Sequence, residues 1–134
     1  MSTQNIVNGV NTDELSKTIN AVQEDPALGK CEFLATNHGI EGGQNPTTVK
    51  DFYGAGQENS RAAPFEFNVD EPPVLLGQDS AANPAEYLLT ALSSCMTTSM
   101  VYHAAACGIK IDDIESQFTG NLDLNKFLGL KEHV

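Results

Sequence analysis

Apolar residues recur with a helical period across the segment from residue 83 to residue 108. The segment opens with asparagine and proline and closes with glycine, residue types that favour the start and the end of a helix. Glu86 lies three residues after Asn83, a spacing that predicts a capping box. The sequence therefore predicts a helix about 36 Å long. Its apolar stripe consists of residues at steps of four, three and four: Leu88, Leu92, Cys95 and Ser99.

A second amphipathic pattern predicts a shorter helix over residues 13–24. Thr12 is expected to cap this helix, and two acidic residues in its first turn complement the positive end of the helix dipole. An Asp-Pro pair directly after residue 24 is expected to end it. Residues 1–11 are expected to be loose, pinned to the body of the protein only through three apolar side chains.

Four segments alternate between apolar and polar residues, which predicts β-strands. These segments are 31–36, 47–53, 64–69 and 114–124. Residues 54–63 are expected to form a loop, and the last ten residues are left without an assignment. The order of the elements, which is helix, strands, long helix and strand, predicts an α+β fold with an antiparallel sheet.

Composition narrows the function classes. A chain of 134 residues without repeats or a linker predicts one domain, 1–134. The formal net charge of −11 argues against nucleic acid and anionic membrane surfaces as partners. No apolar run approaches the roughly 18 residues of a membrane span, and no leader pattern is present. The three cysteines form no CxxC motif and no Cys/His cluster, so we expect no metal, no cofactor and no disulfide, in a reducing cytoplasmic setting.

The apolar stripe of the predicted long helix needs more apolar surface packed against it than a few strands supply. Either a second chain covers it, or further elements of the same protein follow Val134. The first possibility predicts a homodimer with the long helices near its twofold axis. The second predicts that the domain is incomplete at its C-terminus.

Residues 84–95 follow the pattern P-x-E-x-L-L-x-A-L-x-x-C, which resembles the OsmC-like family. That family contains osmotically inducible and organic-hydroperoxide-resistance proteins. The segments VKDFYGAGQENSRAAPF and GNLDLNKFLGL resemble one subfamily, so the resemblance covers nearly the whole chain. It implies an OsmC-like fold in which antiparallel sheets wrap around the long central helices of an intertwined homodimer, with reactive sites at the subunit interface.

The resemblance also implies a chemistry. In the best-studied relatives a helix cysteine attacks a peroxide, a second cysteine resolves the sulfenic acid, and an arginine and a glutamate assist. Cys95 matches the helix cysteine. This chain stops before the segment that carries the second cysteine, and members of the resembling subfamily often have serine there. The assisting glutamate of the relatives lies ten residues before the cysteine, a position held here by Ala85, with Glu86 one place later.

Three residues are therefore predicted to form the site: Cys95, Arg61 and Glu86. Cys95 is either a peroxide-reactive thiol or a small side chain that fills space. Arg61 is the only arginine, and its guanidinium either stabilises the thiolate or is a solvated loop charge, with Lys50 as the alternative cation. Glu86 either assists a catalytic arginine or caps the helix, and these two roles are compatible.

His103 and the two remaining cysteines are given structural roles. His103 follows Cys95 by eight helical residues, about 12 Å, too far to act as its base. A local hydrogen bond is expected for its ring instead. Cys31 and Cys107 are expected to be buried filler.

Two functions remain open from the sequence. The first is a cytoplasmic stress-response enzyme, a thiol peroxidase-like oxidoreductase that detoxifies organic hydroperoxides with Cys95 as nucleophile and an external thiol as reductant. The second is a non-catalytic protein that holds a small apolar ligand in the same cleft of the dimer interface. The helix motif favours the first function, and the missing second cysteine favours the second.

Overall fold

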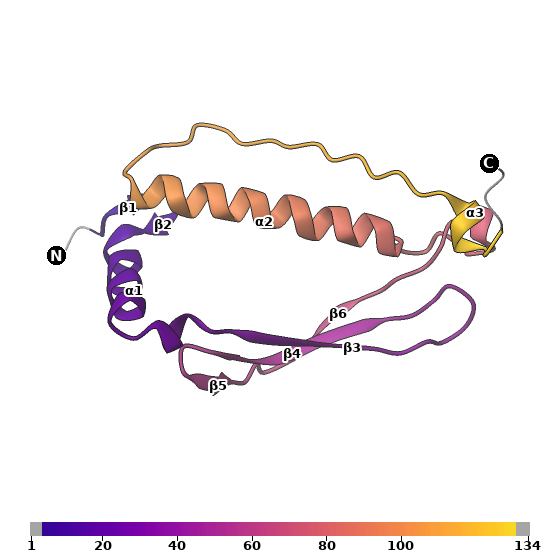
Figure 1. The fold of residues 1–134 in the computed structure, drawn as a ribbon, viewed down its shortest axis with the longest axis horizontal. Helices are drawn as coiled ribbons and strands as arrows, with labels where there is room; N and C mark the ends of the chain where they lie inside the picture. Colours follow the sequence, from indigo (N-terminus) through magenta and orange to yellow (C-terminus); the bar gives the residue numbers. More distant parts are fainter. Residues whose placement is uncertain (1–3, 131–134) are drawn as a thin grey trace.

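The computed structural model describes residues 4–130, so the predictions for residues 1–3 and 131–134 lie outside the described residues. The long helix α2 (Pro84–Ala106) runs through the middle of the molecule. Figure 1 shows the sheet along one side of α2 and the extended chain that follows the helix along its opposite side. The predicted α+β fold with an antiparallel sheet is confirmed.

Strand β4 (Thr47–Gly54) is the centre of the main sheet, because three other strands pair with it. These antiparallel partners are β3 (Glu32–Asn37), β5 (Gln57–Asn59) and β6 (Phe65–Phe67). Strand β3 pairs along most of β4, whereas β5 and β6 pair with the two ends of β4. The three strands predicted between residues 31 and 69 are confirmed, the last of them shortened to three residues.

Two short hairpins, β1–β2 and the end of β4 with β5, occur where loose chain and loop are predicted. Residues 1–11 contain β1 (Ile6–Val7) and β2 (Val10–Asn11), and β5 lies inside the segment 54–63, so both predictions are wrong at these places. Each hairpin turns on two consecutive residues with positive φ, a geometry that suits the twist of paired strands. These residues are Asn8 (51°) with Gly9 (77°), and Ala55 (52°) with Gly56 (78°). The Asn-Gly dipeptide was an available signal for the first hairpin.

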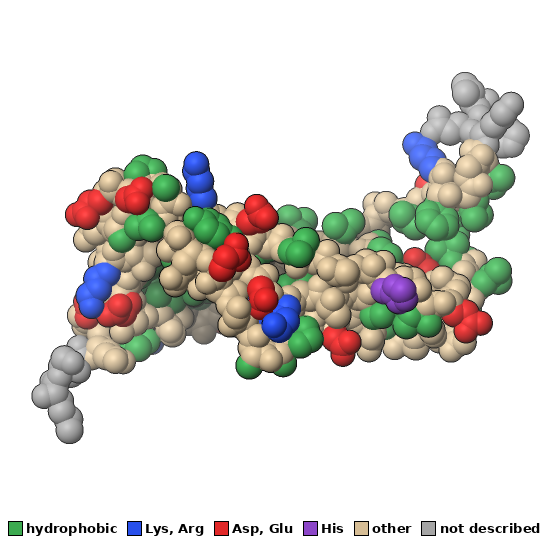
Figure 2. All heavy atoms as spheres, turned by 90° about the horizontal axis from the view of Figure 1, so that it is seen from below, with side chains coloured by type: hydrophobic (Ala, Val, Ile, Leu, Met, Phe, Trp, Pro, Cys, Tyr) green, Lys and Arg blue, Asp and Glu red, His purple; other side chains and the backbone are tan. Residues whose placement is uncertain are grey.

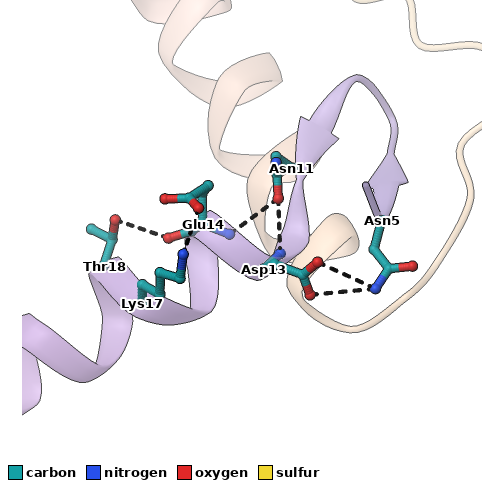
Figure 3. Close-up of polar contacts among 6 residues, drawn as sticks. All are labelled: Asn5, Asn11, Asp13, Glu14, Lys17 and Thr18. Atoms are coloured by element: carbon teal, nitrogen blue, oxygen red, sulfur yellow. Dashed lines mark hydrogen bonds and ion pairs between the residues drawn. The ribbon is translucent and has the colours of Figure 1, made fainter. Parts of the chain in front are cut away.

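Helix α1 (Thr12–Glu24) is capped by Asn11, so the prediction of Thr12 as the cap is wrong. The side-chain oxygen of Asn11 accepts hydrogen bonds from the backbone N–H groups of the second and third helical residues, both at 3.1 Å (Figure 3). The Thr12 hydroxyl is engaged elsewhere, because it donates to the Asn5 carbonyl at 3.1 Å. The predicted extent of the helix is otherwise right to within one residue.

The predicted capping box at the start of α2 is present. The Asn83 side chain accepts a hydrogen bond from the Glu86 N–H at 2.9 Å, and the Glu86 carboxylate accepts one from the Asn83 N–H at 3.1 Å. The helix ends at Ala106, and Gly108 follows with a φ of 68°, which glycine adopts without strain.

The prediction of a strand over residues 114–124 is wrong. The segment runs extended along α2 until α3 (Leu124–Phe127) begins, and it pairs with no described strand. Because α2 lies between this segment and the sheet (Figure 1), its backbone has no described strand beside it to pair with. Asn8 fixes the chain between the end of α2 and this segment. Its side chain donates to the Ile109 carbonyl at 2.9 Å and accepts from the Ile111 N–H at 2.8 Å.

The chain buries little of its own surface. Among the described residues only Gly54, Asp70 and Ala105 are buried, and the side-chain-bearing pair Asp70 and Ala105 are each about 1% exposed. The accessible surface is 10741 Å², whereas a folded monomer of 14.3 kDa exposes about 6,800 Å². Figure 2 shows hydrophobic side chains open on the face that it presents. Much of the apolar surface of residues 4–130 therefore has no other described residue packed against it.

Candidate functional site

Cys95 is exposed in a groove on α2. The groove has a volume of about 560 Å³ and extends over a little more than two helical turns. Small side chains form its middle, and two ring side chains lie at its C-terminal end. Its lining residues are Ser94, Cys95, Thr98, Ser99, Tyr102 and His103. The groove thus brings one thiol, four hydroxyl groups and one imidazole to a single face of the helix.

Large apolar side chains beside the groove are exposed as well. Their exposed fractions are 73% for Leu88, 51% for Leu92, 51% for Met96, 55% for Met100 and 49% for Tyr102. Together with Cys95 and Ser99, these residues are called the outer face of α2 below. A helix stripe of this size requires an apolar surface against it. Within residues 4–130 no element supplies that surface.

Arg61 lies on the sheet and does not line the groove of α2. Its backbone N–H donates to the Asp51 carboxylate at 3.1 Å, and its guanidinium donates to the Lys50 carbonyl at 2.7 Å. The guanidinium carbon also lies 4.7 Å from the ring centroid of Phe52 and 5.1 Å from that of Phe65. These cation–π contacts hold the side chain over the sheet.

Glu86 and Lys50 are likewise engaged away from Cys95. Glu86 closes the capping box and lies nine helical residues before Cys95, a rise of about 13 Å. The Lys50 ammonium lies 3.4 Å from the Asp51 carboxylate. The described residues of this single chain therefore do not gather Cys95, Arg61 and Glu86 around one point.

The predictions for His103, Cys31 and Cys107 need correction. The His103 imidazole makes no hydrogen bond to any described residue and instead lines the groove that contains Cys95. Cys31 and Cys107 are exposed, so their prediction as buried filler is wrong. The physical reason is the small core: a chain that buries so few residues has no interior for these thiols to fill.

A larger apolar cavity lies between the sheet and the start of α2. Its volume is about 600 Å³, within the range of small-molecule sites in proteins. The Tyr87 hydroxyl donates to the Asn68 carbonyl, and the Tyr87 ring meets the Phe67 ring edge-on at 6.3 Å between centroids. These contacts join the sheet to the helix at the cavity. The lining residues are Asn37, Asn45, Thr47, Phe67, Val69, Pro84, Tyr87 and Leu88.

The sequence model of the family described as OsmC-like protein matches residues 77–133. The match supports membership of the OsmC-like family. The matched range contains Glu86 and Cys95, whereas Arg61 lies outside it. Membership supports a stress-related and peroxide-related protein. No curated protein matches the chain.

Within residues 4–130 no helix is long and apolar enough to cross a membrane. The same residues contain no group of three or more histidine, cysteine or acidic side chains that is placed to hold a metal ion.

Sequence reasoning misses Asp70, a buried carboxylate in the segment before α2. Its oxygens accept hydrogen bonds from the N–H of Glu71 (2.8 Å), the N–H of Gln78 (3.3 Å), and the N–H (3.1 Å) and hydroxyl (2.6 Å) of Ser80. These bonds, the Ser80 hydroxyl foremost, lower the pKa of Asp70 below its ordinary value of 3.8. They close the loop 70–80, which leads from the sheet into α2. Aspartate ahead of a Pro-rich turn was the available signal.

Proposed function

We propose that this OsmC-like protein reduces organic hydroperoxides, with Cys95 as nucleophile and a small external thiol as reductant. The observation that carries the proposal is the exposure of Cys95 in a groove with hydroxyl groups and an imidazole. A thiol must be accessible to meet a peroxide. The family match includes this helix. A reducing cytoplasmic setting fits the proposal, because the three cysteines are free thiols.

The proposed cycle has two stages. First, the Cys95 thiolate attacks the outer oxygen of R–O–OH: an S–O bond forms, the O–O bond breaks, and the alkoxide leaves as the alcohol after it takes up the proton that the thiol released. Second, one external thiol condenses with the sulfenic acid to give a mixed disulfide and water. Another external thiol then releases Cys95 and leaves with the first as their disulfide.

The apolar cavity at the start of α2 supports an organic substrate over hydrogen peroxide. Leu88 lines this cavity and also belongs to the outer face. It lies seven helical residues from Cys95, about 10 Å along the axis. In the proposed complex the hydrocarbon part of the substrate extends toward Leu88 and the apolar cavity, while its hydroperoxide group meets the thiol.

The proposal includes a homodimer in which a second copy covers the apolar side chains of the outer face of α2 and leaves a cleft open beside Cys95. The accessible surface of the single chain exceeds that of a compact monomer of its mass by more than half. Surplus exposed surface of this kind is what obligate dimers bury. The extended segment 114–122, whose backbone pairs with no described strand, is a further surface for a second copy to cover.

Arg61 and Glu86 are proposed to assist Cys95, each in a way that follows from its contacts within the chain. Arg61 is held on the sheet, so it would meet Cys95 of the partner subunit and not that of its own chain. Glu86 is held in the capping box, so it would act by fixing the start of the helix. A direct contact between Glu86 and the peroxide is not part of the proposal.

Ligand binding without turnover is the second candidate. The observation that favours it is the apolar cavity, whose lining contains no thiol. A small apolar molecule would fit there whatever Cys95 does.

Replacement of single cysteines tests the proposal. Consumption of cumene hydroperoxide is measured with dithiothreitol as reductant for Cys95→Ser, with Cys31→Ser and Cys107→Ser as matched controls because these thiols are also exposed. We expect Cys95→Ser to lose the protein-dependent rate and both controls to keep it. Equal rates in Cys95→Ser and wild type would refute Cys95 as nucleophile. Binding of cumyl alcohol without any peroxide consumption would favour the second candidate.

A further inference from the structure

The Cys95 groove has a symmetric arrangement along the helix. Its lining consists of three adjacent pairs at steps of four residues: 94 and 95, 98 and 99, 102 and 103. Reversing the direction of the helix about the midpoint between residues 98 and 99 maps this set onto itself. Small side chains lie at the centre of the set, and the two rings lie at one end.

A surface of this kind suits a twofold interface. In such an interface the same patch of both subunits meets itself, so a helix that crosses the axis packs against an antiparallel copy. Small residues at the crossing let two helix axes approach to about 8 Å. With the axis at the centre of the groove, residue numbers that face each other add up to about 197. Cys95 then faces residues 102 and 103 of the other copy.

The exposed surface area of the chain and the residues beside the groove both point to a second copy of the chain as the occupant of the groove. The chain exposes far more surface than a compact monomer, and the apolar side chains that flank the groove are about half exposed. Met96 and Met100 are long, adaptable side chains on this face. In the antiparallel arrangement they flank the shallow centre of the other copy's groove. A second copy therefore supplies both the missing cover and the matching shape.

From this register we infer that Cys95 lies against Tyr102 and His103 of the partner subunit, and that the imidazole of the partner's His103 accepts the proton of the Cys95 thiol. The inference rests on the proposed dimer and deepens the proposed peroxidase reaction. Within one chain His103 lies eight residues from Cys95, about 12 Å along the axis, so it serves this thiol only across the interface. Its ring makes no hydrogen bond to a described residue and is available for this role.

Cys95 and the partner's His103 account for both proton transfers in the first stage of the reaction. The imidazole takes the proton from the Cys95 sulfur before the sulfur attacks the peroxide. The alkoxide that leaves takes the same proton back from the imidazolium, so that the base returns to its starting state. No further acid or base is needed for the first stage of the proposed cycle.

Disulfide trapping tests the register without any peroxide turnover. In a Cys31→Ser, Cys107→Ser background, the variant Tyr102→Cys retains the native Cys95, and mild oxidation is expected to link two chains through positions 95 and 102. The same background without Tyr102→Cys is the control, because two Cys95 side chains lie on opposite sides of the axis and should stay unlinked. Faster linking of the control, a monomer in sedimentation, or no linking in a sedimentation-proven dimer would each overturn the inference.

Mixed dimers test the role of the imidazole. Iodoacetamide labelling of Cys95 is measured by mass spectrometry in the Cys31→Ser, Cys107→Ser background at neutral pH. Adding His103→Gln is expected to slow labelling about tenfold. Mixing this protein with excess of the same background carrying Cys95→Ser pairs each Cys95 with an intact His103 of the other chain, so the fast rate should return.

The mixing result separates this inference from other roles of His103. If His103 acted only on its own helix or only in packing, the mixed dimers would stay slow, and the inference would be wrong. Restored labelling in a protein that consumes no cumene hydroperoxide would uphold the paired groups while refuting the peroxidase function.

Discussion

The loop of residues 70–80 and the outer face of α2 differ in where their contacts come from. In the loop, the carboxylate of Asp70 accepts hydrogen bonds from four groups, all within ten residues. Gly77 packs so closely on the Glu71 carbonyl that a side chain there would collide with it. On the outer face, by contrast, Leu88 and its neighbours are half exposed or more.

This difference separates what a short segment can satisfy by itself from what needs a large surface. Hydrogen bonds are local and directional, so a turn of ten residues can provide every partner that one carboxylate requires. Burying the apolar side chains of a helix requires an apolar surface of matching area. One small chain has too little of this surface to enclose a helix of 23 residues. A substitution in the loop should therefore change only the local stability of the loop. A substitution on the outer face should instead change the dimer Kd.

The largest effect is expected on the outer face. Leu92→Asp places a carboxylate where the proposed dimer buries an apolar side chain. An unpaired charge in an apolar interface costs several kcal/mol, so the dimer Kd should rise by about a thousandfold or more. Sedimentation over a range of protein concentrations measures this change.

Thr90→Asp is the matched control for Leu92→Asp. Thr90 lies on α2 two residues earlier and therefore on a different side of the helix, where its hydroxyl donates to the Glu86 carbonyl at 2.9 Å. We expect this variant to keep the dimer. If Leu92→Asp and Thr90→Asp associate equally well, the outer face is not the interface.

A smaller, local effect is expected in the loop. Asp70→Asn replaces one carboxylate oxygen by an NH₂ group, which must then face N–H donors and leaves some of them unpaired. Cleavage by a protease within residues 71–80 should become about tenfold faster, because it follows the population of the opened loop. Helix content by circular dichroism should stay unchanged.

Asp79→Asn is the matched control in the same loop. Asp79 has a φ of 54°, a conformation that asparagine also tolerates. We expect wild-type cleavage rates from it. Equal acceleration in both variants would show that loss of a negative charge, and not loss of the hydrogen bonds of Asp70, opens the loop.

Sequence patterns predict this fold where the determinants are local. The capping box of Asn83 and Glu86, the length of α2 and the central strand β4 all follow from residues within one element. The strand prediction over 114–124 fails because alternation describes a strand but cannot supply its partner. The burial of Asp70 could not be predicted from a sequence pattern, because it depends on the closure of a loop. The Cys95 groove could not be predicted either, because exposure is a property of the packed chain.

Acid should weaken the loop less abruptly than Asp70→Asn does. The folded-state pKa of Asp70 lies below 3.8, so its contribution to stability is fully present above that value and is lost as the pH falls through the folded pKa. Digestion by pepsin between about pH 2 and 5 should therefore reveal faster cleavage of the loop toward the acid end. In Asp70→Asn this pH dependence should shrink. An identical pH profile in the variant would assign the acid response to other carboxylates.

The smallest effect concerns the cap of α1, which is Asn11 and not the expected Thr12. Asn11→Ala removes the acceptor of two backbone N–H groups and should lower the free energy of unfolding by about 1 kcal/mol. Thr12→Ala removes only the exposed bond to the Asn5 carbonyl and should cost about 0.5 kcal/mol. Asn11→Asp keeps a capping oxygen and should resemble wild type. Urea unfolding at one fixed protein concentration measures all three, and a larger loss for Thr12→Ala than for Asn11→Ala would restore Thr12 as the cap.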